Sequence, residues 1–540
     1  MHNTRYAPNG MVCTVDHLAS AAGVGALDRG GSAADAAIAA NAVLAVVAPH
    51  MCGLGGDLFA LVHDGTATGT VADTVADTVA DKGTGTVPGT VPGTVTALNA
   101  SGRAGSGADP ARLRAEGHTR MPHLHDVRSV PVPGCVDGWL ALHARHGRLP
   151  MAELLRPAIA LARDGFPASP LLVPGARTAA ARPGGGDFAS VRRAGDRVTR
   201  PGVARALQAV ADGGRDGFYL GEFGQGLIEL GAGEYTAADL AVPGADWVEP
   251  LRVRAFGHDV WSMPPNSQGY LLLMSLAVLD GLDLPGSPRH PAWAHLLSEA
   301  ARAAGHDRLD LLHEDAKDLL DPGEIARRRA LVDPVRRSRL RAPSADGDTT
   351  YLCAVDGDGM GVSLIQSNAS GFGGMLFEPR TGINLHNRGI GFSLRPGHPA
   401  EYGPGRRPPH TLTPALITRP GGGLRTVVGT MGGDAQPQIL AQVITRLLRH
   451  GEEPGQALAA PRWRLGGGNG FDTWDAPDDA VLDLEEGTTW ADGLTVLGHP
   501  VRTLPYGGSF GHAHLIDVRP DGMLAGAADP RSLVGAAIGR

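Results

Sequence analysis

A threonine at the start of a predicted strand is the strongest candidate nucleophile in the sequence. Thr349 follows the polar run Pro343-Ser344-Ala345-Asp346-Gly347-Asp348 and opens the strand-like segment 349–355. Inside a chain, a threonine at such a place is an ordinary β-branched strand residue. Cleavage of the Asp348–Thr349 bond would expose an α-amine with a reference pKa of about 7.7–8.0, able to act as base for the same residue's hydroxyl. Thr349 would then supply both the nucleophile and its base.

A pair of glycines could complete this chemistry by binding a developing negative charge. Gly432 and Gly433 lie between a predicted strand at 424–428 and a predicted helix at 437–450. Backbone N–H groups at a strand-to-helix junction can point toward an anion, because the start of a helix carries unpaired donors. The sequence therefore predicts an oxyanion-binding turn here.

Other catalytic patterns have weaker support. The run Gly507-Gly508-Ser509-Phe510-Gly511 matches the nucleophile elbow of serine α/β-hydrolases, but a strand rather than a helix is predicted to follow, and no histidine follows Asp517. The pairs His123/His125 and His512/His514 offer two metal ligands each without a third at a suitable spacing, so structural or surface histidines are favoured. We expect neither a metal nor an organic cofactor.

The elements that must position these residues follow from hydrophobic periodicity and turn signals. Ser32 is a candidate N-cap, and Asp35 three residues later supports the first turn of the helix. The order of elements indicates segregated layers rather than repeated β-α-β units. Helices are predicted at 17–30, 33–47, 135–147, 151–163, 202–213 and 291–305, and strands at 58–63, 351–355, 362–365, 480–484 and 512–518.

Composition limits the classes of function. The chain has 540 residues, 42% of them hydrophobic, and a formal charge of −8, which argues for a large core and against a broad basic surface for nucleic acid. No run of about eighteen apolar residues is present, so no membrane span is expected and a cytoplasmic protein is the default. The four cysteines lack metal-ligand spacing and are read as buried thiols. The arginine run 327–329 is read as a solvated helix face.

One segment has no predicted role. Thr-Val-Ala-Asp recurs from Thr70 to Asp81 and Thr-Val-Pro-Gly from Thr86 to Gly93. A period of four is too short for a solenoid repeat, so an extended surface hairpin or loop is predicted within 66–95.

Several motifs in order resemble the γ-glutamyltransferase (γ-glutamyltranspeptidase) family of N-terminal-nucleophile hydrolases, in its divergent bacterial branch. The resemblance covers nearly the whole chain. It rests on the segments 30–39 (Gly-Gly-Ser-Ala-Ala-Asp-Ala-Ala-Ile-Ala), 49–56 (Pro-His-Met-Cys-Gly-Leu-Gly-Gly), 101–103, 132–134, 348–351, 413–414 and 432–433.

The resemblance implies a self-cleaving proenzyme and assigns roles to particular residues. The Asp348–Thr349 bond would break by an N-to-O acyl shift, giving a large subunit, 1–348, and a small subunit, 349–540, intertwined in one structural unit. Ser367 matches the residue that hydrogen-bonds the nucleophile, Gly432 and Gly433 match the oxyanion glycines, and Arg103 matches the arginine that holds the substrate's α-carboxylate.

The chain departs from the family pattern where the substrate's α-ammonium is held. The family's asparagine falls on Ala369 with Asn368 adjacent, its glutamine and aspartate fall on Arg388 and Gly391, and its paired serines fall on His410 and Thr411. We therefore treat Arg388, Asn368, His410 and Thr411 as substrate-binding candidates. The attack machinery is retained and the α-amino pocket is not, so glutathione is a doubtful substrate.

These observations predict an α+β, four-layer αββα fold with two stacked antiparallel sheets. The predicted activity is hydrolysis or transfer of an acyl group by Thr349 on an amide or related bond of a small carboxylate-bearing, γ-glutamyl-like substrate. A carbon–carbon bond hydrolase of a biosynthetic pathway, a non-catalytic scaffold and a serine hydrolase acting through Ser509 are the alternatives. The expected partners are the small-molecule substrate and the two subunits of the precursor, without nucleic acid or membrane; a homo-oligomer is left open.

Overall fold

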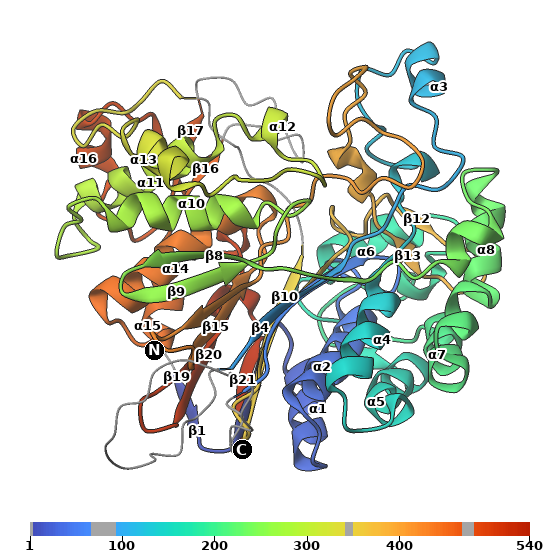
Figure 1. Ribbon diagram of the computed structural model, residues 1–540. Helices are drawn as coiled ribbons and strands as arrows, with labels where there is room; N and C mark the ends of the chain where they lie inside the picture. Colours follow the sequence, from blue (N-terminus) through green and yellow to red (C-terminus); the bar gives the residue numbers. More distant parts are fainter. Residues whose placement is uncertain (1–3, 66–92, 341–348, 467–479) are drawn as a thin grey trace, which may run out of the picture.

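Two seven-stranded sheets lie face to face at the centre of the molecule (Figure 1). The structure is a computed structural model that describes residues 4–65, 93–340, 349–466 and 480–540. In spatial order, the first sheet contains β1 (Arg5–Ala7), β20 (Leu524–Ala528), β19 (Ala513–Val518), β15 (Leu424–Thr430), β14 (Ala415–Thr418), β9 (His258–Ser262) and β8 (Leu251–Ala255). The second contains β21 (Ala536–Gly539), β2 (Gly10–Thr14), β10 (Thr350–Asp356), β11 (Gly361–Ser367), β3 (Asp57–His63), β4 (Val95–Ala100) and β7 (Asp246–Val248). Neighbouring described strands of both sheets pair antiparallel.

Strand β10 shows why both faces of its sheet are buried. Successive side chains of a strand point to opposite faces. Tyr351, Cys353 and Val355 belong to the core between the two sheets, whereas Leu352 and Ala354 pack into the core under the helices. A strand apolar on both faces therefore belongs in the middle of a layered structure.

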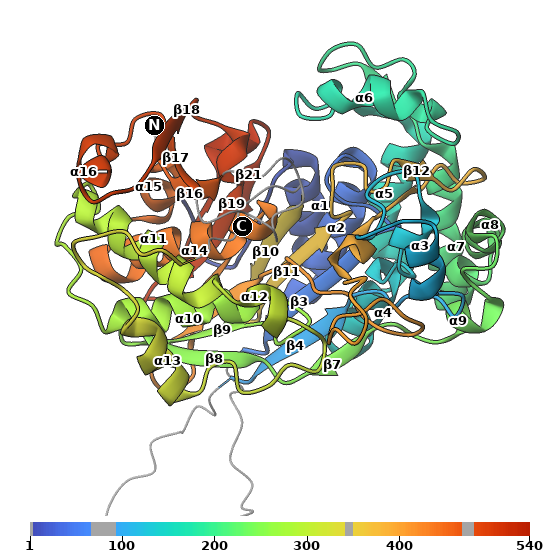
Figure 2. The ribbon, with the colours of Figure 1, turned by 90° about the horizontal axis from the view of Figure 1, so that it is seen from above.

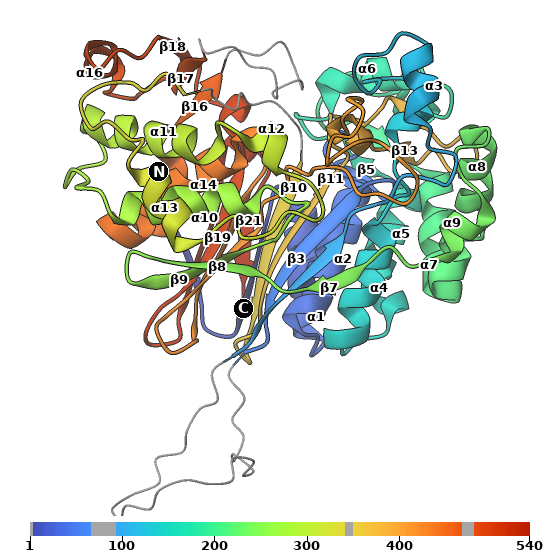
Figure 3. The same cartoon turned by 45° about the horizontal axis from the view of Figure 1, so that its top comes forward.

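Helices cover the outer face of each sheet (Figures 2 and 3). On the second sheet these are α1 (His17–Asp28), α2 (Ala33–Val47) and α4 (Cys135–His146), with α5 (Met151–Asp164) and α7 (Pro201–Tyr219) packed on these helices. On the first they are α10 (Gly269–Asp280) and α14 (Gln436–His450), with α11 (Pro291–Gly305) packed on both helices. The order helix, sheet, sheet, helix confirms the predicted four-layer αββα fold.

Both sheets draw strands from both sides of residue 349. The first sheet joins β1, β8 and β9 to β14, β15, β19 and β20, and the second joins β2, β3, β4 and β7 to β10, β11 and β21. The central strand β10 pairs with β2 on one side and β11 on the other. The two parts of the chain therefore share their cores.

Helix α2 illustrates how closely local signals define the elements. Ser32 accepts a hydrogen bond from the Asp35 N–H, and the Asp35 side chain accepts one from the Ser32 N–H, forming a capping box. All fifteen residues of the helix are buried. Its small side chains let it lie close beneath the sheet, in contact with α1 and α5.

A third, smaller sheet packs on the helices that cover the first sheet. β16 (Trp463–Gly466), β17 (Val481–Glu485) and β18 (Val501–Leu504) form a three-stranded sheet. Its apolar side chains Leu482 and Leu484 pack with Trp293 and Leu297 of α11. This small sheet is thereby fixed to the helical layer.

The structure corrects three details of the sequence analysis. The first predicted helix ends at Asp28, and the helix predicted at 202–213 extends to Tyr219 across a kink at Gly214, where φ is +57°. The arginine run 327–329 at the end of α13 (Pro322–Arg329) is not wholly solvated. Arg328 is 2% exposed and forms ion pairs with Asp307 and Glu324. These carboxylates compensate the loss of hydration of the guanidinium, so it can be buried.

Some expectations fall outside the described residues, and others are confirmed. The repeats up to residue 92 and the run 343–348 are outside them. All four cysteines are buried and free. Among the described helices, none combines the length and apolar character needed to cross a bilayer.

Candidate active site

The end of the central sheet brings Thr349 and Ser367 together. Thr349 immediately precedes β10, and Ser367 is the last residue of β11. Thr350 pairs with Gln366 in the antiparallel register, so Thr349 falls opposite Ser367. Both residues are 1% exposed, and the Thr349 hydroxyl donates a hydrogen bond of 3.1 Å to Ser367 Oγ. The structure thus places the predicted nucleophile beside the hydroxyl predicted to contact it.

The residues after Ser367 hold that hydroxyl in place. The Ala369 N–H donates to Ser367 Oγ at 2.8 Å, in a turn where Ala369 has a φ of +75°. The Asn368 side-chain nitrogen donates to the carbonyls of Pro49 and Gly371 at 3.0 and 3.3 Å. Asn368 Oδ1 is buried and accepts no hydrogen bond from the described residues. Asn368 therefore anchors the strand end to the Pro49 loop, with one acceptor left over.

Glycine in the 53–56 turn allows a close approach of two backbones. A Cβ atom on Gly56 would lie 2.5 Å from the Ser367 carbonyl oxygen, closer than non-bonded atoms allow. The glycine motif thus packs the turn against the end of β11. This packing accounts for the glycine at 56. The chain then enters β3 at Asp57.

The Gly432–Gly433 turn lies at the same end of the molecule. A Cβ on Gly429 near the end of β15 would lie 2.2 Å from the Tyr351 ring, so the end of β15 packs against the beginning of β10. Gly432 and Gly433 follow with φ values of +136° and +53°, conformations that favour glycine. The turn continues through the 3₁₀ helix η4 (Gly433–Ala435) into α14, so it forms the strand-to-helix junction that the sequence predicts.

A buried carboxylate cluster extends the site on the other side of Ser367. Asp57 pairs with Ser367 in the strand register. Its Oδ2 lies 3.1 Å from His410 Nε2 and 3.4 Å from His386 Nδ1, and its Oδ1 accepts the Gly102 N–H at 2.9 Å. Burial raises the pKa of Asp57, but the two imidazoles and the Gly102 N–H outweigh it and bring the pKa to about 2. Asp57 is therefore ionised at neutral pH.

His410 is neutral beside this carboxylate. Burial, and then the neighbouring Arg388, lower the pKa of His410 to about 3. The Leu412 N–H donates to His410 Nδ1 at 3.3 Å, which leaves the proton on Nε2 to be donated to Asp57. The predicted substrate residue His410 is thus fixed in one tautomer at the edge of the site.

Arg388 lies among buried charges rather than in solvent. It begins the 3₁₀ helix η3 (Arg388–Gly391) and is 2% exposed. Burial lowers its pKa to about 10, against the opposing effect of Asp57 and Asp434, so the guanidinium stays charged at neutral pH. Arg308 adds a second buried guanidinium, which donates a hydrogen bond to Asp434. Because Asp434 follows Gly433, these charges border the glycine turn.

A cavity of about 400 Å³ opens beside these charges. Gly391, Ile390, Pro409 and Arg308 line it. A Cβ on Gly391 would lie 2.5 Å from the Pro409 carbonyl oxygen, so the backbone itself forms part of the wall. The position at which the family resemblance places an aspartate is therefore occupied by tightly packed backbone.

Two of the predicted substrate-binding residues, Arg103 and Thr411, neither line the cavity nor form a hydrogen bond with Thr349 in the part of the chain that the structure describes. Arg103 is 42% exposed, donates to Glu314 and the Gly405 carbonyl at 3.3 and 3.0 Å, and lies 3.5 Å from Asp246. It is not among the described residues that line the cavity. Thr411 is buried, and its Oγ1 has no hydrogen-bond partner among the described residues.

Four charged or titratable members of the site were not expected from the sequence: Asp57, His386, Arg308 and Asp434. Asp57 stands at the start of a strand that is apolar up to its last residue, His63, and Asp434 follows the glycine pair, so both carried a local signal. His386 and Arg308 lie in irregular or short segments, and only the fold brings them to the site.

The weaker catalytic patterns receive structural explanations. Ser509 lies in the 3₁₀ helix η5 (Gly508–Phe510), which leads to strand β19, so the helix that a nucleophile elbow requires does not follow it. His123 lies 3.2 Å from Ser370, and His125 contacts Arg182. His512 and His514 are both buried.

Comparison with known proteins identifies the family of the chain. The family model described as gamma-glutamyltranspeptidase matches residues 19–86 and 82–539. The glutathione hydrolase-like YwrD proenzyme of Bacillus subtilis is 34% identical, over 98% of both chains. The oxamate amidohydrolase proenzyme of Klebsiella pneumoniae is also 34% identical, over 98% of this chain and 99% of its own.

Solved structures give the same result for the fold. The cephalosporin acylase of Bacillus halodurans superposes with a TM-score of 0.85 at 30% identity, covering 100% of this chain and 97% of its own. Family and fold therefore agree over the full described length. The chain belongs to the γ-glutamyltranspeptidase family and is an enzyme of that family.

Proposed function

We propose that the protein is a self-processing amide hydrolase in which Thr349, freed by cleavage after Asp348, attacks an acyl group that carries a carboxylate and no α-ammonium. The observation that carries this proposal is the buried hydroxyl pair of Thr349 and Ser367, at the sheet end that also holds the Gly432–Gly433 turn. The proenzyme names of the two relatives are consistent with processing.

In the processing step, Thr349 Oγ1 attacks the carbonyl carbon of Asp348. An ester to Oγ1 forms as the carbon–nitrogen bond breaks, and the proton lost by the hydroxyl ends on the released amine. Water then hydrolyses the ester. This leaves an N-terminal threonine whose hydroxyl remains beside Ser367.

In turnover, the free α-amine accepts the hydroxyl proton as Oγ1 attacks the substrate carbonyl. The N–H groups of Gly432 and Gly433 are the proposed donors to the oxyanion, and the positive φ values of both residues support this assignment. The amine then returns the proton to the leaving group, and water or another acceptor takes the acyl group.

The substrate preference follows from the charges at the cavity. Arg388 and Arg308 are buried cations: Arg308 donates a hydrogen bond to Asp434, and the charges of Asp57 and Asp434 favour the charged form of Arg388. Gly391 supplies no side chain for a substrate ammonium, which would have to be buried beside two guanidiniums. A substrate carboxylate is attracted there, and arginine can bind it with two hydrogen bonds. Glutaryl and oxalyl groups meet this description.

A denaturing gel and a paired substrate assay test the two parts separately. Wild-type protein should give two bands, the smaller beginning Thr-Thr-Tyr-Leu, and Thr349→Ala should give one. Cleaved enzyme should then hydrolyse glutaryl-p-nitroanilide in preference to γ-glutamyl-p-nitroanilide, and Arg388→Met should reduce that preference more than Arg388→Lys does. A different N-terminus refutes the nucleophile. A γ-glutamyl preference unchanged in Arg388→Met refutes only the assigned specificity.

A further inference from the structure

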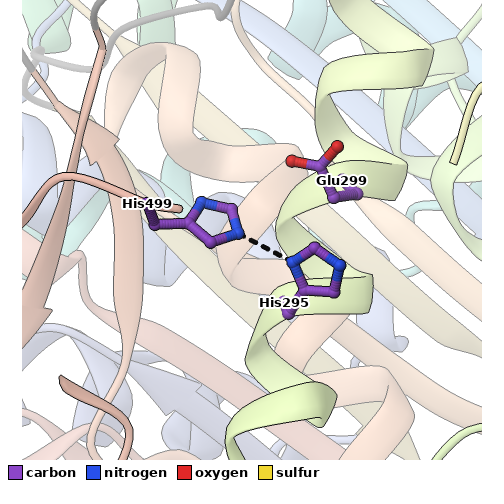
Figure 4. A group of neighbouring side chains, drawn as sticks. All are labelled: His295, Glu299 and His499. Carbon is purple, nitrogen blue, oxygen red and sulfur yellow. Dashed lines mark hydrogen bonds between the residues drawn. The ribbon is translucent and has the colours of Figure 1, made fainter. Parts of the chain in front are cut away.

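Two histidines and a glutamate form a buried cluster in the helical layer above the first sheet (Figure 4). His295 and Glu299 lie four residues apart on α11, so their side chains share one face of the helix. His499 comes from the segment just before β18. The three residues are 0%, 1% and 2% exposed. Their potential ligand atoms all lie within 4.8 Å of one another.

The two histidines bring one ring nitrogen each close together, with the far nitrogen of His295 held by a carbonyl. His295 Nε2 lies 2.8 Å from the Asp333 carbonyl and must donate to it, which leaves the lone pair of Nδ1 facing His499. His295 Nδ1 and His499 Nε2 are 2.7 Å apart. A carbonyl that holds the far nitrogen of an imidazole is the usual outer partner of a metal-bound histidine.

The glutamate adds an oxygen with unused hydrogen-bonding capacity. Glu299 Oε2 accepts the Ser338 N–H at 2.8 Å, whereas Oε1 is buried and accepts no hydrogen bond from the described residues. Oε1 lies 3.6 Å from Nε of Arg302. A buried carboxylate oxygen with only a long ion pair leaves much of its desolvation uncompensated, and a bound cation would supply the missing partner.

We propose that His295, Glu299 and His499 bind one Zn²⁺ ion, through His295 Nδ1, His499 Nε2 and Glu299 Oε1. Two imidazoles and one carboxylate are a common zinc ligand set, and tetrahedral zinc needs nitrogens roughly 3.3 Å apart, so the imidazoles must separate slightly. On binding, the His499 proton moves from Nε2 to Nδ1. Arg302 and Arg337 add positive charge nearby, which opposes any cation, so the bonds to imidazole must outweigh this repulsion. Zn²⁺ forms strong bonds to imidazole, whereas Mg²⁺ and Ca²⁺ prefer oxygen ligands.

The proposed ion would join three separate parts of the chain. His295 and Glu299 belong to α11, His499 leads into β18, and the outer partners Asp333 and Ser338 belong to the segment that follows α13. The site is on α11, whereas Thr349 and Ser367 lie at the end of the second sheet. The role of the zinc ion would therefore be to stabilise this layer of the structure. The ion would have no part in the proposed reaction.

Metal binding can be measured directly on the full chain. Protein stripped with a chelator is dialysed against ZnCl₂ and its zinc is measured by mass spectrometry, and Co²⁺ is added to a second sample to record its visible spectrum. We expect one zinc per chain, a higher melting temperature with zinc, and a Co²⁺ spectrum typical of four- or five-coordinate nitrogen and oxygen ligation. Wild-type protein that shows neither zinc retention nor a Co²⁺ spectrum would overturn the proposal without any variant.

Variants then identify the ligands. His499→Gln and Glu299→Gln should each weaken zinc binding at least about tenfold, the lower end of the usual loss for a disturbed metal site. His17→Gln removes an exposed histidine at the start of α1 and should bind zinc as wild type does. Zinc that is retained equally by both site variants places the ion elsewhere and refutes the assignment. The Co²⁺ spectrum of the wild type keeps the test valid if a variant fails to fold.

Discussion

At the scale of single residues, the Ser367 hydroxyl contacts the hydroxyl of Thr349. Ser367 Oγ accepts from the Thr349 hydroxyl and from the Ala369 N–H, so the threonine is held from a fixed point on the neighbouring strand. Holding reacting atoms in one geometry accelerates a reaction by removing the need to find that geometry. We therefore propose that Ser367 positions Thr349 both for processing and for turnover.

Removing the Ser367 hydroxyl should slow both steps. Ser367→Ala leaves the buried Thr349 hydroxyl without its acceptor, and a hydrogen bond of this kind is worth about 1 kcal/mol, so a loss of about fivefold or more is expected. Processing is followed on gels and turnover with a p-nitroanilide substrate. Ser367→Thr retains a hydroxyl and should recover most of the rate. Equal rates in the alanine variant and wild type would remove Ser367 from the mechanism.

At the scale of elements, the glycine turn after β15 is the part of the site most sensitive to geometry. Gly432 and Gly433 have φ values that side chains adopt only with strain. Their N–H groups are directed by that backbone, so a change in φ redirects the donors. The turn also places Asp434, and hence Arg308, at the site.

Gly433→Ala should therefore reduce turnover more than stability. Misaligning one oxyanion donor typically costs about 10²–10³ in turnover. A left-handed alanine costs roughly 1 kcal/mol or a little more in folding. Turnover and melting temperature are measured on the same preparation. Gly451→Ala, at the αL cap after α14 and with open space around its Cβ, carries the same backbone strain away from the turn and serves as the control. Near-wild-type turnover in Gly433→Ala would exclude this turn from catalysis.

How much of this could be predicted from the sequence depends on how local each signal is. The hairpin that joins β10 and β11 and the capped helix α2 could be predicted, because turn residues and a capping box lie within a few positions of the elements that they define. Thr349 could be predicted because it follows a polar run and opens a predicted strand, whereas the role of Ser367 comes only from the family resemblance. Asp57 and His410 are 353 positions apart, and no local pattern links them. Arg328 was misread because a run of arginines does not reveal the carboxylate of Asp307 that the fold supplies.

At the scale of the whole molecule, the interleaved sheets predict that cleavage does not separate the parts. β10 pairs with β2 and β11 with β3, so residues before and after 349 share hydrogen-bonded strands and one buried core. Fragments 1–348 and 349–540 should co-elute in gel filtration without denaturant and separate only in a denaturing gel. Independent elution of the smaller fragment under native conditions would contradict this.

The stability of the fold at acid pH depends on buried histidines that the fold keeps neutral. Burial is the first cause that lowers the pKa of His410 and His514 to about 3 and of His512 to about 4, from an ordinary 6.5. Between pH 6.5 and these values the unfolded chain binds a proton at each residue and the folded chain does not. Stability therefore falls as the pH falls through this window, by about 1 kcal/mol per histidine for each pH unit.

Melting temperatures at pH 7.5 and 5.5, with a chelator present, measure this loss. The wild type should melt several degrees lower at pH 5.5. His512 has both ring nitrogens buried without a hydrogen-bond partner among the described residues, so His512→Leu removes one of these protonations with little loss of bonding and should reduce the difference between the two temperatures. His17→Gln, which changes an exposed imidazole, should leave that difference as in the wild type.

Carboxyl groups whose pKa is raised by burial, such as Asp137 and Asp356, act in the opposite direction, but they are common to all three proteins. The comparison therefore isolates the contribution of one histidine, and an unchanged difference in His512→Leu would show that this imidazole is already protonated, or reached by water, in the folded protein.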